Sequence, residues 1–137
     1  MILRRNPRVS RIVPGGFVAP GSTPFYTGQL RSGPYGNSVP VSGADISSMV
    51  LTICNTQTGV IINNRNEIDF FSAGGTVDKD GVLTFPLAAG DTSLLDTPEL
   101  VRVERSLIFE GFYNANQKAF RIERHFIIEE LADGLQH

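Results

Sequence analysis

At 137 residues the chain is long enough for one domain with a modest core, and its hydrophobic content of 41% is ordinary for a globular protein. No run approaches the roughly 18 apolar residues of a membrane-spanning helix, so we expect no membrane segment. The formal net charge is -2, and the single cysteine excludes an internal disulfide. The basic residues near Met1 are not followed by an apolar run, so we also expect no cleaved signal peptide.

Residues 1–43 differ in composition from the rest of the chain. Six of the eight prolines lie in the first 40 residues, and each disfavours a helix in the residue before it. The segment carries about +5 and the remainder about -7, because five arginines are its only side chains that are charged at neutral pH. They are Arg4, Arg5, Arg8, Arg11 and Arg31. We interpret residues 1–43 as an extended, basic, Pro/Gly-rich arm and residues 44–137 as a separate domain.

The arm also contains large apolar side chains, which are unusual in a solvated tail. We predict that it binds partner subunits, with its aromatic residues as apolar anchors and its arginines as complementary charges. These aromatic residues are Phe17, Phe25, Tyr26 and Tyr35. The alternative is that the arm packs back on its own domain. Five arginines without interleaved lysines or a recognisable nucleic-acid fold are a weak signal for nucleic acid, so we expect a protein partner.

Residues 44–137 alternate apolar and polar side chains, with turn signals 8 to 12 residues apart, as is typical of an all-β sandwich or barrel. We expect strands at residues 49–54, 60–62, 67–70 and 83–85, and two long final strands. Residues 87–95 are expected to contain a single helical turn. Residues 78–81 have the carboxylate spacing that opens a calcium loop, but the remaining ligands are missing. The Asp-Gly pair there predicts a tight hairpin instead.

The two long strands can be aligned by pairing Phe109 with Phe120. This register places Arg105 opposite Arg124 on the otherwise apolar face. Two guanidinium groups in a small core are costly, so we expect that end of the face to be open or to contact an acidic partner. A register slip or bulge that turns both arginines to water is the alternative. The same register predicts two pairs on the other face, Glu104 with His125 and Ser106 with Glu123.

No motif for catalysis, metal binding or cofactor binding is present, and we expect neither an enzyme nor a bound cofactor or metal. The sequence has no Gly-x-Ser-x-Gly elbow, no phosphate-binding glycine loop and no Cys-x-x-Cys pair. We interpret His125 as a histidine on a strand face beside Glu104. We interpret Cys54, which lies inside a strand pattern, as a small core residue.

The order of these elements resembles the immunoglobulin-like N-terminal domain of phage baseplate upper proteins. The matching features are the strand at 49–54, the turn at 55–59, the hairpin into 82–87, the segment 88–92 and the long closing strands. The resemblance covers roughly residues 44–131, about two-thirds of the chain. It implies an immunoglobulin-like antiparallel β-sandwich that binds proteins and has no catalytic residues. The long basic arm and the lack of a receptor-binding or coiled-coil extension depart from that pattern, and they leave head-decoration and connector roles open.

From these features we expect a non-enzymatic structural protein of a tailed-phage virion. It would bind neighbouring capsid, connector or tail subunits through its arm and its sandwich faces. We expect a homo-oligomer or a high-copy assembly, located in the virion. The alternative is a carbohydrate- or receptor-binding sandwich, for which Phe112 and Tyr113 are the aromatic candidates on a loop.

Overall fold

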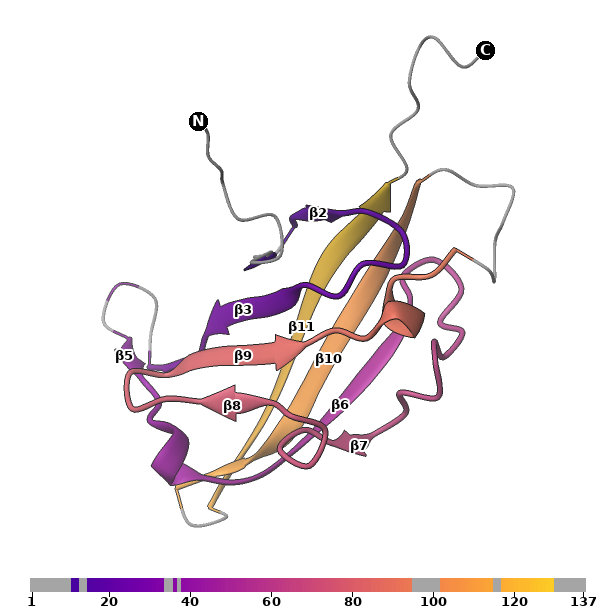
Figure 1. The fold of residues 1–137 in the computed structure, drawn as a ribbon. Coiled ribbons are helices and arrows are strands. Elements are labelled where there is room, and N and C mark those ends of the chain that lie inside the picture. The colour runs from indigo at the N-terminus through magenta and orange to yellow at the C-terminus, as the bar shows by residue number, and fades with distance from the viewer. Residues whose placement is uncertain are drawn as a thin grey trace, which may run out of the picture.

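The computed structural model describes residues 11–12, 15–33, 36, 38–94, 102–114 and 117–129. Two main sheets face each other across one hydrophobic core, as Figure 1 shows. The all-β sandwich that the alternating pattern predicts is therefore confirmed. Two of the strand pairs, β1 with β3 and β2 with β11, are parallel, so the sheets are mixed and not purely antiparallel.

The larger sheet has the strand order β2-β11-β10-β6-β7. Its strands are β2 (Phe17–Val18), β11 (Lys118–Glu129), β10 (Arg102–Tyr113), β6 (Ile46–Asn55) and β7 (Ile68–Asp69). The smaller sheet has the order β1-β3-β9-β8. Its strands are β1 (Arg11–Ile12), β3 (Phe25–Gln29), β9 (Val82–Pro86) and β8 (Thr76–Val77).

Four shorter elements complete the described fold. The strands β4 (Arg31–Ser32) and β5 (Val39–Pro40) pair with each other in a small antiparallel ribbon. Two 3-10 turns lie at η1 (Gly43–Asp45) and η2 (Ala89–Asp91), and η2 confirms the helical turn predicted within residues 87–95. The predicted tight hairpin is also confirmed, because β8 and β9 pair antiparallel and Asp78 Oδ1 accepts bonds from the amides of Asp80 and Val82.

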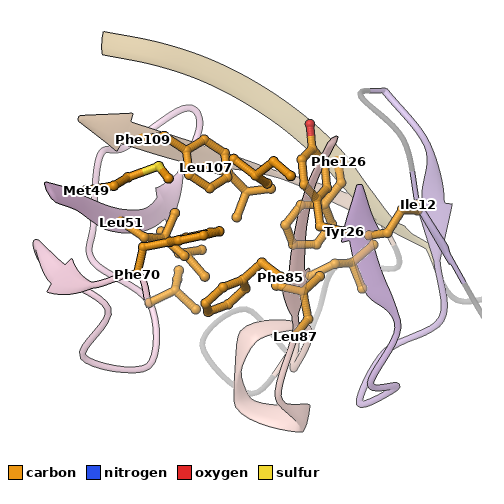
Figure 2. Packing of buried hydrophobic residues seen from close by; sticks show 14 of the residues in the cluster. Ile12, Tyr26, Met49, Leu51, Phe70, Phe85, Leu87, Leu107, Phe109 and Phe126 are labelled. Atoms are coloured by element: carbon orange, nitrogen blue, oxygen red, sulfur yellow. The ribbon is translucent and has the colours of Figure 1, made fainter. Parts of the chain in front are cut away.

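The core is organised around aromatic rings contributed by both sheets, as Figure 2 shows. Tyr26 from β3 stacks on Phe109 from β10 with ring centroids 6.2 Å apart. Phe70, which directly follows β7, meets Phe109 edge-on at 5.8 Å and Phe85 of β9 at 5.6 Å. Such aromatic pairs stabilise a core beyond the area that they bury, so these four rings connect the two layers.

The segment predicted to be an arm contributes strands to both sheets from residue 11 onward. β3 pairs with β9, β1 pairs with β3, and β2 pairs with β11. The boundary predicted at residue 43 therefore does not separate an arm from a domain, and the described part of the segment follows the alternative of packing back on its own domain. The physical reason is apolar burial, because Ile12, Tyr26 and Leu30 are buried members of the core cluster. Residues 1–10 lie outside the described ranges.

The predicted register of the β10–β11 hairpin is wrong by two residues. Phe109 pairs with Ile122, and Arg105 pairs with Phe126. Tyr113 pairs with Lys118, and Asn114 begins the turn with a left-handed backbone (φ 61°) that asparagine tolerates better than most residues. A shift by two leaves every side chain on its predicted face, so the face assignments hold while the predicted cross-strand partners do not.

Candidate partner-binding surfaces

The predicted partner-binding residues fall into different environments. Arg4, Arg5, Arg8 and Tyr35 lie outside the described residues. Arg11 lies in β1, where its backbone is opposite Phe25 of β3. The structure therefore does not bring the predicted residues together in one site, and the remaining ones are described separately below.

Phe17 and Phe25 are exposed on the N-terminal strands. The side chain of Phe17 in β2 is 56% exposed, and that of Phe25 in β3 is 43% exposed. The guanidinium of Arg102 lies 5.2 Å from the centroid of the Phe17 ring, a cation–π geometry, and it also lies 3.6 Å from Glu129. Arg102 was not predicted, because its contact with Phe17 depends on the parallel pairing of β2 with β11, for which the sequence has no local signal.

Tyr26 is buried, so the prediction that it anchors a partner is corrected. Its side chain is 1% exposed and belongs to the core cluster. Burial raises the pKa of its hydroxyl to about 12, an effect that the positive charge of Arg124 partly offsets. Within the described part of the chain, this hydroxyl has no hydrogen-bond partner.

Arg105 is fully buried on the interior face of β10, so it too is not an exposed partner-binding residue. Its guanidinium donates to the carbonyl oxygens of Asp91 (3.0 Å) and Ser93 (2.7 Å). Asp91 is the last residue of the η2 turn and Ser93 follows it. Their carbonyl oxygens provide part of the hydrogen bonding that a buried cation requires. The prediction that this end of the face is open or binds an acidic partner is therefore wrong for Arg105.

The η2 turn also holds a buried ion pair that the sequence pattern did not predict. Asp91 is 0% exposed, and its carboxylate accepts from Arg65 Nε at 2.9 Å and Arg65 Nη2 at 3.1 Å. Asn63 Nδ2 and the backbone amide of Ala88 donate to the same carboxylate. This network connects the loop after β6 to the segment after β9, and we interpret it as structural because its atoms are used within the fold.

Arg31 and Arg124 are exposed cations, and Arg31 lines an apolar groove. Arg31 donates to Ser38 Oγ, to the Ser38 carbonyl and to Gln29 Oε1. Arg124 donates to the carbonyl oxygen of Glu123 at 2.9 Å. The groove has a volume of about 130 Å³ and lies between β4, the start of β6 and the β10–β11 hairpin. Its lining residues are Leu30, Arg31, Val41, Ile46, Tyr113, Ala119, Phe120 and Ile122.

The outer face of the larger sheet has a cluster of polar side chains around His125. His125 Nδ1 lies 2.8 Å from Glu104, and its Nε2 lies 3.0 Å from Glu123. The predicted proximity of Glu104 and His125 is confirmed, although their contact is diagonal, since Ser106 is the residue directly opposite His125. The hydrogen bond to Glu123, followed by that to Glu104, raises the pKa of His125, while partial burial opposes the rise. In the described ranges, no group of three or more His, Cys, Asp or Glu side chains is arranged to hold a metal ion.

Two further candidates behave as ordinary structural residues. Cys54 is buried as predicted, and this burial raises the pKa of its thiol. Phe112 is 45% exposed, whereas Tyr113 bonds to Ser32 Oγ at 3.0 Å and packs edge-on against Phe120. Because neighbours on a strand point to opposite faces, Phe112 and Tyr113 do not form one aromatic platform for a sugar.

Comparison with known proteins gives no match: no family model, no curated protein and no solved structure is similar to this chain. In the part of the chain that the structure describes, no helix has the length and apolar character needed to cross a membrane. The structure on its own therefore defines the class of the molecule as an all-β sandwich.

Proposed function

We propose that this protein is a structural component of a tailed-phage virion, which binds neighbouring capsid, connector or tail subunits. The observation that carries the proposal is the exposure of Phe17 in β2 and Phe25 in β3. The guanidinium of Arg102 lies over the ring of Phe17. Exposed aromatic side chains next to arginines are typical of the residues that dominate protein interfaces.

The charge distribution supports the same proposal. The only side chains of the first 43 residues that are charged at neutral pH are basic, and all of the acidic residues follow them. Copies of such a chain, or partners of similar design, attract one another through opposite charges and gain stable contact from the aromatic anchors. Many weak contacts of this kind add in a repetitive assembly, because each further contact forms at a high effective concentration.

The test is the protein content of purified particles from the phage that encodes this chain, measured by quantitative mass spectrometry. We expect the protein at a fixed copy number per particle, and we expect the double variant Phe17→Ser and Phe25→Ser to reduce incorporation strongly. Val60→Ser is the matched control, because Val60 is 58% exposed but lies in the loop after β6. Absence from particles, or equal incorporation of the double variant, would overturn the proposal.

A further inference from the structure

The apolar groove continues toward the middle of the sandwich as a smaller hollow between β3 and β11. This hollow has a volume of about 20 Å³ and shares Leu30 and Ile122 with the groove. Tyr26 and Arg124 also line it. We call the two neighbouring hollows together the side channel; they lie on the side of the sandwich where β3 and β11 are each the second strand from the end of their sheet.

One wall of the side channel is an open strand edge. β2 pairs only with Ile127 and Ile128 of β11, and the backbone bonds from Gly15 to His125 and from Ile127 to Gly16 occupy the same end of that edge. Among the described residues, no strand pairs with the first half of β11 on the side away from β10, where the guanidinium of Arg124 donates to the carbonyl oxygen of Glu123.

The positions of these bonds show which backbone groups face the open edge. His125 and Ile127 direct their backbone groups away from β10, and this direction repeats every second residue along a strand. The amides of Ala119, Arg121 and Glu123 therefore face the open edge, while the side chains of the residues between them point toward the side channel. Such an edge is a template for another extended chain.

The charge around the side channel is of one sign. Arg31 and Arg124 are its charged lining residues, and no acidic residue lines either hollow. In the described part of the chain, no carboxylate lies within ion-pair distance of either arginine. An incoming chain that carries carboxylates would pair with both cations, whereas a basic one would be repelled.

Tyr26, which lines the smaller hollow, has a buried hydroxyl. Figure 2 shows the hydroxyl oxygen at the margin of the aromatic cluster, pointing away from the other rings. It lies on a side chain that is 1% exposed, and within the described residues it has no partner. A buried polar group usually has a hydrogen-bond partner, so this hydroxyl marks a position for a polar atom of a bound molecule or a water.

We propose that the open edge of β11 binds an extended acidic segment of a partner protein, which adds a strand to the larger sheet. Its backbone pairs with Ala119, Arg121 and Glu123, and its alternate apolar side chains enter the side channel. Its carboxylates lie on the same strand face as these apolar side chains, against Arg31 and Arg124. This inference stands on the described geometry and does not depend on the proposed virion function.

The probe is a capped peptide, Glu-Thr-Val-Thr-Val-Thr-Glu, which as a strand presents its valines and glutamates on one face. It is added to the full-length protein and followed by amide chemical shifts. We expect saturable shifts at Ala119, Arg121 and Glu123. We also expect the double variant Arg31→Glu and Arg124→Glu to weaken binding by about tenfold or more, since like charges at an interface are repulsive. The matched control is Lys79→Glu, which reverses an exposed charge in the β8–β9 turn that lines neither hollow.

A second variant tests the strand addition itself. Ala119→Pro removes an N–H that faces the open edge and is not used in the ladder with β10, so the fold is expected to tolerate it while peptide binding is lost. Equal binding of the same peptide with lysine in place of glutamate would overturn the acidic specificity. No saturable shift at the three edge amides, or unchanged binding by the folded Ala119→Pro protein, would overturn the site.

Discussion

At the scale of single residues, buried polar groups carry more of the stability than exposed ones. The carboxylate of Asp91 is fully buried and accepts from Arg65, Asn63 and the amide of Ala88, so its loss leaves several donors without an acceptor. We expect Asp91→Asn to lower the free energy of unfolding by about 3 kcal/mol, measured by urea denaturation. Glu129→Gln breaks the exposed contact with Arg102 and is expected to cost less than about 1 kcal/mol. Equal costs for the two variants would contradict this ranking.

At Gly111 the backbone of β10 lies close against β6. A Cβ atom added there would collide with the carbonyl oxygen of Ser48 and approach the backbone of Met49. We expect Gly111→Ala to destabilise the protein by about 1–3 kcal/mol, measured by thermal unfolding, because backbone atoms must move to admit the methyl group. Gly28→Ala is the matched strand control, since its Cβ would meet only Tyr26 at an ordinary 3.9 Å. If the two variants unfold at the same temperature, the close approach at Gly111 does not limit the size of the side chain there.

At the scale of the elements, the outer face of β11 couples stability to pH through His125 and Glu123. The pKa of His125 is raised, first by its hydrogen bond to Glu123, so its stabilising contribution is complete below about 6.5 and is lost as pH rises through the folded pKa. The pKa of Glu123 is lowered, first by the bond to His125, so its contribution is present above its unfolded pKa and is lost as pH falls through its folded pKa.

The resulting prediction concerns the titration of His125. In an NMR titration of the imidazole we expect a midpoint above the ordinary value of about 6.5, because both neighbouring carboxylates favour the charged ring. Glu123→Gln should move this midpoint downward, and Glu67→Gln, in the loop between β6 and β7, should leave it unchanged. A midpoint at or below the ordinary value would show that the contacts do not stabilise the charged ring in solution. Since His125 is partly exposed, its effect on total stability is small.

The sequence predicted the elements of residues 44–129 better than their pairing. Alternation placed Val103, Leu107 and Phe109 on one face, and all three are buried. It could not choose between the pairing of Phe109 with Phe120 and the pairing with Ile122, because a shift by two residues preserves both faces. The strands β1 and β2 were missed for another reason. Each has two residues, which is too short for a periodic pattern.

The candidate surfaces were predictable only where exposure follows from local sequence. Phe17 and Phe25 are exposed as expected of anchors, but nothing local distinguishes them from Tyr26, which β3 turns into the core. The burial of Arg105 depends on carbonyl oxygens from the segment that follows β9. Such contacts join residues that are distant in the sequence, so they cannot be predicted from composition and spacing.

At the scale of the whole molecule, the N-terminal strands are part of the sandwich. Deleting residues 2–36 removes β3 with the buried Tyr26 and Leu30, and it exposes the edge of β9. Losing a buried aromatic side chain alone costs about 3–5 kcal/mol, a large part of a typical total stability of roughly 5–15 kcal/mol. We therefore expect the protein without residues 2–36 to lose cooperative thermal unfolding, followed by circular dichroism. Deletion of residues 2–10 keeps every described strand and should unfold cooperatively near the temperature of the full chain. A cooperative transition in the larger deletion would show that residues 37–137 fold alone.

The parallel pair of β2 and β11 joins the beginning of the described chain to its end, since Ile127 comes 110 residues after its partner Phe17. During synthesis on the ribosome, the N-terminal residues leave the exit tunnel first, and domains form as their segments emerge. The strand pair of Phe17 with Ile127 cannot form until nearly the whole chain has been translated, and contacts between such distant residues form slowly. Phe17 is exposed during this time. Nascent chains are consequently most vulnerable to chaperone capture or aggregation at the aromatic residues that emerge earliest.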